Sequence, residues 1–222
     1  MLAGDNALHE FSAWQTGLDH CRAQGLDRDA RLHVFANDTF CHHRVFGGFQ
    51  LWAFRRAFRH LARRRGPGFA GETFALAEPV RLDGQVFPAW VSTYLFAVNR
   101  PGLAALGNRI ATPRTELDLY VRGGPDEAAF FSDRVPENLR LHLRGWLFEP
   151  EIRPRWRRSA ALGPGNAAMM AAKARAIISE KLLAARATAG GVTIHGVYRV
   201  FVVRVVRRLR WMLGMGGRRK GA

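Results

Sequence analysis

Three consecutive polar residues, Asn37, Asp38 and Thr39, follow a short apolar segment and are the first candidates for chemistry. Residues 31–35 alternate loosely between polar and apolar side chains, which predicts a strand that runs into a polar loop. A carboxylate at a strand end can hold Mg²⁺ or Mn²⁺ against a diphosphate, while nearby amide and hydroxyl groups bind phosphate oxygens or waters. The same residues could instead cap the next helix or stabilise a turn, as Asp and Asn commonly do.

Further ligand-type residues lie close to Asp38 in the sequence. His33, Cys41, His42 and His43 would allow a transition-metal site, but their spacing matches no zinc pattern. His33 and Asp38 also have the bare spacing of an acyltransferase dyad, without supporting residues around them. We therefore favour the capping role of Asp38 over both of these hypotheses.

Two segments carry a resemblance to a known family. Residues 34–40 (VFANDTF) and 90–103 (WVSTYLFAVNRPGL) resemble the rhamnan-synthesis type of bacterial polysaccharide glycosyltransferase, over about residues 31–105. The resemblance implies a GT-A-like fold with Asp38 at the metal-diphosphate position, and with Trp90, Ser92 and Thr93 near the sugar or acceptor. It also implies Mg²⁺ or Mn²⁺ as cofactor, and a nucleotide-sugar and a glycan acceptor as substrates.

The sequence departs from that family in two ways. Residues 1–30 are too few for a complete nucleotide-binding half, and the chain has no Asp-x-Asp pair. Part of the donor site would then be missing. If glycosyl transfer occurs, metal and arginines would stabilise the departing diphosphate while a carboxylate deprotonates an acceptor hydroxyl. Asp83 and Asp118 are candidates for that catalytic base, although a role as a turn or surface residue is favoured for each.

The charge of the chain points to anionic partners. Lys and Arg number 34 against 18 Asp and Glu, which gives a formal net charge of +16 and a sequence pI near 11.5. Only Lys173, Lys181 and Lys220 are lysines, so the basicity is nearly all arginine, which suits bidentate phosphate or carboxylate contacts. An arginine-biased genome would produce the same skew. The chain has no Cys/His finger, RNP-like aromatic run or clear helix-turn-helix, so we expect no specific binding of nucleic acid.

The C-terminal region carries a second basic pattern. Residues 197–213 predict a helix with apolar side chains on one face and arginines on the other, although their valines would also suit a strand. Such a helix can lie in the interface of an anionic membrane, or it can pack on the core with its arginines in solvent. The arginines that would face the membrane surface are Arg199, Arg204, Arg207, Arg208 and Arg210.

The remaining patterns define the elements that must position these residues. Helical spacing predicts helices over residues 5–24 and 44–65. Residues 136–148 fit both strand alternation and helical spacing, and Pro136 favours a helix. A helix over 166–187 is predicted from its many good helix formers. The helix over 44–65 would place Leu51, Phe54, Phe58 and Leu61 on its core face, and we expect its other aromatics and the pair Met169-Met170 in the core. Strands are predicted at 31–35, 72–77, 86–98, 117–121 and 192–195, with a turn at 82–85. The mostly apolar segment 90–98 would be the central strand.

The fold class that follows is α/β: a single domain over residues 1–196 with a mixed sheet flanked by helices, GT-A-like and lacking part of the nucleotide-binding half. The basic helix over 197–213 and a flexible Gly/Arg tail over 214–222 would follow it. Two cysteines, no signal pattern and no transmembrane stretch indicate a cytoplasmic protein, with peripheral attachment to the inner membrane through the basic helix.

The sequence leaves two functions open. The leading hypothesis is a metal-dependent glycosyltransferase-like protein of bacterial surface-polysaccharide biosynthesis. The alternative is a non-catalytic basic module that binds a membrane surface or nucleic acid.

Overall fold

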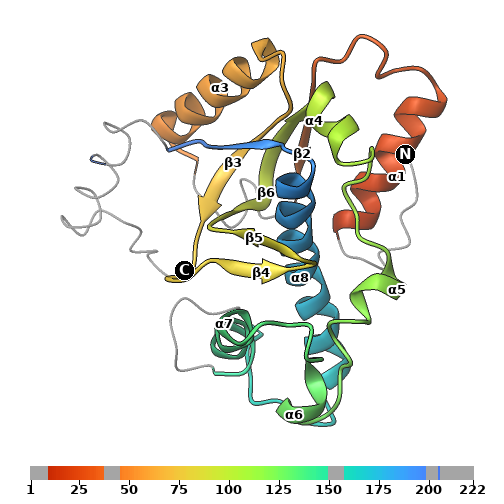
Figure 1. Cartoon of the computed structure of the whole chain (residues 1–222), viewed down its shortest axis with the longest axis vertical. Coiled ribbons are helices and arrows are strands. Elements are labelled where there is room, and N and C mark those ends of the chain that lie inside the picture. The colour runs from red at the N-terminus through yellow and green to blue at the C-terminus, as the bar shows by residue number, and fades with distance from the viewer. Residues whose placement is uncertain (1–9, 38–45, 150–157, 199–204, 206–222) are drawn as a thin grey trace, which may run out of the picture.

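The computed structural model describes residues 10–37, 46–149, 158–198 and 205. These residues form a four-stranded sheet in the order β2-β6-β3-β7, where the strands are β2 (Leu32–Ala36), β3 (Gly68–Phe74), β6 (Trp90–Asn99) and β7 (Thr193–Gly196). β6 is antiparallel to both β2 and β3, whereas β7 is parallel to β3. The predicted mixed sheet flanked by helices is confirmed, and β6 lies inside it as its apolar sequence indicates (Figure 1).

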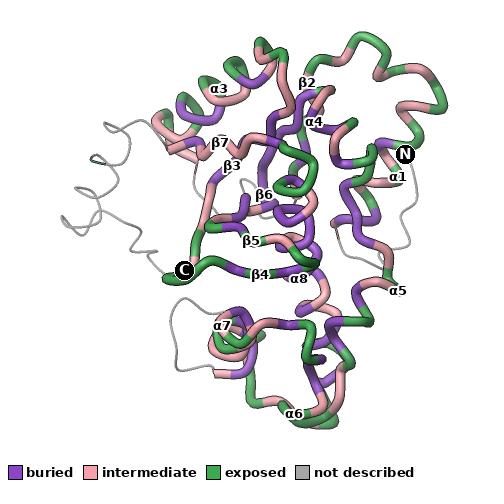
Figure 2. Tube along the Cα trace, viewed as in Figure 1, coloured by how far each residue is buried: buried purple, intermediate pink, exposed green. Residues whose placement is uncertain are grey.

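Helices cover both faces of the sheet. Phe96 and Val98 of β6 pack in one cluster with residues of α1 (Glu10–Ala23) and α8 (Ala167–Ala189), while the intervening Ala97 packs with Leu61 of α3 (Gly48–Arg63). Neighbouring residues of a strand point to opposite faces, so α3 covers one face and α1 and α8 cover the other. All three β6 residues are fully buried, which explains their unbroken apolar run. Figure 2 shows that β6 is buried along most of its length.

The end of β6 is fastened to α4 (Arg100–Ala105) and to the start of β3 by one side chain. The Oδ1 of Asn99 accepts hydrogen bonds from the backbone N–H groups of Gly68 and Gly102, both at 2.9 Å. Its Nδ2 donates to the carbonyl of Gly66 at 2.9 Å. A Cβ on Gly102 would lie 2.5 Å from the carbonyl oxygen of Gly68, so the helix can approach the strand this closely only with glycine.

A second core lies around a small hairpin. β4 (Val80–Leu82) and β5 (Gln85–Phe87) pair antiparallel, and their turn residues Asp83 and Gly84 have φ values of +50° and +72°. The turn is thus where the sequence predicts it. Leu82 of this hairpin packs with α7 (Glu137–Leu147), α8, α5 (Arg114–Leu117) and α6 (Glu127–Phe130).

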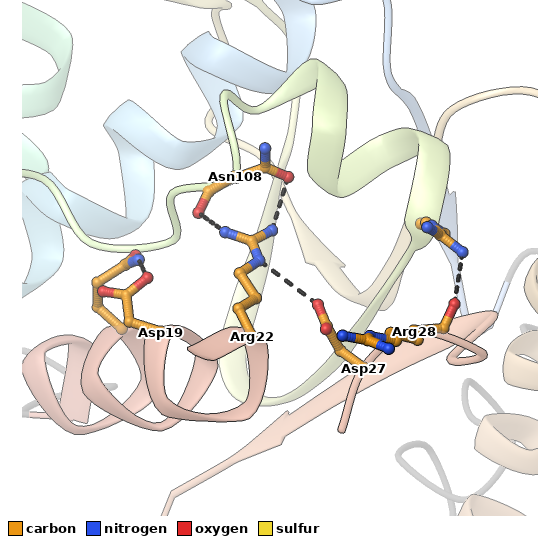
Figure 3. A network of polar contacts seen from close by, with 7 residues as sticks. Asp19, Arg22, Asp27, Arg28 and Asn108 are labelled. Carbon is orange, nitrogen blue, oxygen red and sulfur yellow. Dashed lines mark hydrogen bonds and ion pairs between the residues drawn. The ribbon is translucent and has the colours of Figure 1, made fainter. Parts of the chain in front are cut away.

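The turn between α1 and β2 is tied to the end of α4 (Figure 3). The guanidinium of Arg22 donates to the carbonyl oxygen of Asn108 at 3.0 Å and to its Oδ1 at 2.6 Å, and it lies 3.5 Å from Asp27. Arg100 donates to the carbonyl of Arg28 at 2.7 Å. These contacts fix the entry of the chain into β2.

Most predicted elements are confirmed, but two predicted strands are wrong. The segment predicted as one strand over 86–98 forms β5 and β6, which belong to different sheets, and the strand predicted over 117–121 is not formed. α5 ends at Leu117, residues 118–120 form a turn, and Val121 makes an isolated bridge to Phe131. Leu117 and Val121 are buried while Leu119 is 46% exposed, so burial repeats every four residues rather than every two. β3 also begins at Gly68, four residues before the predicted start at residue 72.

Candidate functional site

The predicted strand-end site begins where the sequence places it. Asn37 directly follows β2, and its backbone N–H donates to the carbonyl of Tyr94 in β6 at 3.2 Å. Its Nδ2 donates to the Oε1 of Glu10 in α1 at 3.3 Å. Asp38 and Thr39 lie outside the described residues, so their contact with metal or substrate stays a prediction. The neighbouring Cys41, His42 and His43 also lie outside them.

The other predicted substrate residues lie in an irregular part of β6. Gly71 of β3 pairs with Phe96, and Thr73 pairs with Val91. Between these two pairs β3 advances by two residues and β6 by five, so residues 92–95 bulge away from β3. This segment contains Ser92 and Thr93, and Trp90 stands just before it.

Glu180 of α8 provides the hydrogen-bond acceptor for Thr93 in the bulge. Its Oε2 accepts from both the backbone N–H and the hydroxyl of Thr93, each at 3.0 Å. Its Oε1 lies 2.5 Å from the Nζ of Lys181, and that ammonium lies 3.7 Å from the ring centroid of Trp90. We call Trp90, Thr93, Glu180 and Lys181 the interior polar cluster.

The interior polar cluster is enclosed. Lys181 is 2% exposed, and burial lowers the pKa of its ammonium while the carboxylate of Glu180 partly offsets this effect. On α7, burial also lowers the pKa of His142, and the positive charge of Lys181 adds to it; the His142 ring lies 6.0 Å from Trp90. A lysine amine with a lowered pKa suits proton transfer, but one this enclosed does not meet a substrate in this arrangement. The contacts instead join α8 to the bulge.

The two candidate bases occupy different surroundings. Asp83 is an exposed residue of the β4–β5 turn with a left-handed backbone. Asp118 accepts at one oxygen from the Nε atoms of Arg114 and Arg175, at 2.9 and 2.8 Å. Burial acts to raise the pKa of Asp118, but these two guanidinium groups outweigh it and hold the pKa below its usual value. A carboxylate held in this way is a weak base, and the catalytic role of either residue stays a prediction.

A second buried polar contact lies on the opposite face of the sheet. The hydroxyl of Tyr94 donates to the Oε2 of Glu72 at 2.8 Å, and Glu72 is 2% exposed. Phe46 and Phe54 pack around the Tyr94 ring. The burial of Glu72 and Lys181, and the partial burial of Glu180, were not predicted from the sequence. The one available signal was their position within otherwise apolar segments.

The outer surface of α3 carries a row of charged side chains. Its exposed basic residues line a surface hollow together with Gly48, Leu51 and Trp52. We call the following set the arginine face: Arg55, Arg56, Arg59, His60 and Arg63. Across the part of the chain that the structure describes, none of its four arginines forms an ion pair.

The exposure of Leu51 and Trp52 contradicts the sequence analysis. Leu51 is 50% exposed and Trp52 46% exposed, although both were expected in the core. The buried side of α3 is made by Ala53, Phe54 and Leu61. Met169 is likewise exposed, whereas its neighbour Met170 is buried as expected.

The described residues contain no group of three or more side chains that could hold a metal ion. None of the described helices is both long and apolar enough to cross a membrane. The arginines predicted to face a membrane, from Arg199 to Arg210, lie outside the described residues. Comparisons with protein-family models, curated proteins and solved structures find no match to this chain.

Proposed function

We propose that this protein binds a phosphate-bearing anionic partner through the arginine face of α3. The observation that carries the proposal is the row of exposed arginines that have no acidic partner among the described residues. From residue 47 to residue 71 the sequence contains no Asp or Glu at all. The positive charge of this surface is therefore not balanced from within α3 itself.

Other arginines of the chain are used differently. Arg22, Arg144 and Arg175 pair with Asp27, Glu127 and Asp118, respectively. These side chains stabilise the fold through local contacts, whereas the arginines of α3 point to solvent.

The spacing within α3 strengthens this contrast. Arg55, Arg59 and Arg63 follow one another at four-residue steps, so their charges lie on one side of the helix. Like charges at this spacing destabilise a helix by about 0.2–0.5 kcal/mol per pair. An anionic partner relieves that repulsion, and guanidinium groups bind phosphate oxygens in bidentate geometry.

Retention on immobilised heparin tests the proposal without presupposing the class of partner. The variant Arg55→Gln/Arg56→Gln/Arg59→Gln/Arg63→Gln should elute at clearly lower salt than the wild type, because four phosphate-binding charges are lost. A matched control removes the same net charge from exposed arginines elsewhere: Arg28, Arg31, Arg109 and Arg122. If both quadruple variants elute at the same salt, retention reflects net charge alone and α3 is not the binding surface.

A GT-A-like site for a nucleotide-sugar and Mg²⁺ or Mn²⁺ is a separate, second proposal. It is favoured by the position of Asn37, which follows directly on β2 as the resemblance implies. It depends on Asp38, and an assay of that residue is described below.

A further inference from the structure

One end of the arginine face is apolar. Leu51 and Trp52 lie at its N-terminal end, one turn before Arg55 and Arg56, and Arg63 lies about 17 Å further along the helix axis. An exposed Leu and Trp side by side leave apolar area in water, which costs free energy unless a partner covers it. The surface thus offers two kinds of contact: apolar at one end and cationic along the rest.

The Trp52 ring is already flanked by neighbours. Phe49 lies against it with ring centroids 6.1 Å apart and planes 27° apart, and the guanidinium of Arg56 lies 5.5 Å from its centroid. A nucleic-acid base stacks on an open ring face, and these contacts reduce the face that is available. Insertion among lipid chains needs only the exposed edge, and the aliphatic Leu51 beside it has no stacking partner in nucleic acid.

The segment after β7 packs beside the same part of α3. The ring of Tyr198 lies 6.4 Å from that of Phe49 and 6.4 Å from that of Phe54.

We propose that the partner of the arginine face is the surface of an anionic lipid bilayer, with Leu51 and Trp52 inserted at the level of the headgroups. This inference rests on the proposed function and names its partner. The arginines contact lipid phosphates, and each basic residue near an anionic surface strengthens attachment by about fivefold. Burial of the two apolar side chains supplies the rest of the binding free energy, and salt does not screen this contribution.

The test measures co-sedimentation of the full chain with vesicles of phosphatidylcholine alone or of equal parts phosphatidylcholine and phosphatidylglycerol. We expect binding to the anionic vesicles only. Leu51→Ser/Trp52→Ser should weaken it by about tenfold or more, since two half-exposed side chains lose their burial. Leu141→Ser, which changes a similarly exposed leucine of α7, is the control and should bind as the wild type does. Circular dichroism would verify that each variant is folded.

Fluorescence gives a second readout of insertion. Vesicles with brominated acyl chains should quench a larger fraction of the tryptophan fluorescence of the wild type than of the Trp52→Phe variant. The reason is that the substitution removes the one tryptophan of α3. Equal fractional quenching of the two proteins would show that Trp52 does not enter the bilayer, and would overturn the inference.

Two failures are distinguishable. If a single-stranded oligonucleotide binds more tightly than anionic vesicles at the same salt, or if Leu51→Ser/Trp52→Ser binds vesicles normally, the lipid inference is wrong. The proposed function survives that result as long as the α3 arginines still control retention on heparin. If they do not, both proposals fail together.

Discussion

The pair formed by Glu180 and Lys181 allows a quantitative test of what holds the centre of the molecule together. Glu180→Gln and Lys181→Met each remove one charge with little change of volume, and the double variant removes both. Lys181 is 2% exposed and its Nζ contacts Glu180 and the Trp90 ring. Glu180 keeps its two hydrogen bonds from Thr93 when Lys181 is replaced.

These contacts make the two single variants unequal. Removing one partner of a buried ion pair costs about 3–5 kcal/mol because the other charge is left uncompensated. Glu180→Gln should approach that loss, since Lys181 would retain only the Trp90 ring. Lys181→Met should cost less, about 1–2 kcal/mol, because charge-assisted hydrogen bonds of about 1.5–3 kcal/mol each still hold the Glu180 carboxylate. The double variant should recover at least 2 kcal/mol relative to Glu180→Gln, because no buried charge remains unpaired.

Urea denaturation at pH 7, followed by far-ultraviolet circular dichroism, measures all four free energies of unfolding. Equal slopes with urea concentration would show that the variants unfold from comparable states. The coupling energy of the cycle should exceed about 1 kcal/mol, as found for residues in one contact network. Additive losses, with a coupling energy near zero, would refute the argument that the two charges compensate each other in the interior.

Three further predictions concern single residues. Because the pKa of Lys181 is lowered, the folded protein binds fewer protons than the unfolded chain between that pKa and 10.5. The free energy of unfolding should therefore rise with pH in this window. Chemical denaturation of Lys181→Met should show a smaller rise over the same window. Asn99→Ala should lose about 3–5 kcal/mol because two buried N–H groups lose their acceptor, while Asn166→Ala, at a half-buried residue, should lose no more than about 1 kcal/mol in the same assay. Under the glycosyltransferase hypothesis, Asp38→Ala should abolish the thermal shift that nucleoside diphosphates with Mn²⁺ produce, and leave the melting temperature without ligand within a few degrees. A lower melting temperature with the ligand response intact would identify Asp38 as a cap.

The sequence predicts the sheet well where burial is uniform. Residues 90–98 are almost all apolar because β6 is covered by helices on both faces, and an apolar run rich in β-branched and aromatic residues is typical of a strand inside a sheet. The turn at Asp83 and Gly84 is predictable for a related reason, since few residue types accept a left-handed backbone. In both cases one local property determines the structure.

The periodicity of a helix does not predict which of its residues are buried, because burial also depends on the elements packed around it. The spacing of Leu51, Phe54, Phe58 and Leu61 identifies the side of α3 that faces the core. It does not show that the first turn of α3 lies beyond the edge of the core. Leu51 is exposed for that reason. The helix α8 shows the opposite case: Leu182 faces one core and Leu183 the other, so even a charged side chain in this part of the helix becomes buried.

The bulge in β6 and the charged pair of α8 are best understood as one feature. A strand that leaves its partner for several residues exposes backbone N–H groups, and a buried N–H without an acceptor costs about 1–3 kcal/mol. Thr93 obtains its acceptor from Glu180, and this partly buried carboxylate is paired with the buried ammonium of Lys181, which lies against the Trp90 ring. Each residue of this group thus provides a hydrogen-bond acceptor, a counter-charge or a ring contact for the residue before it. Trp90 and Thr93, which the resemblance assigns to substrate binding, therefore have a structural reason to be present whether or not a substrate binds nearby.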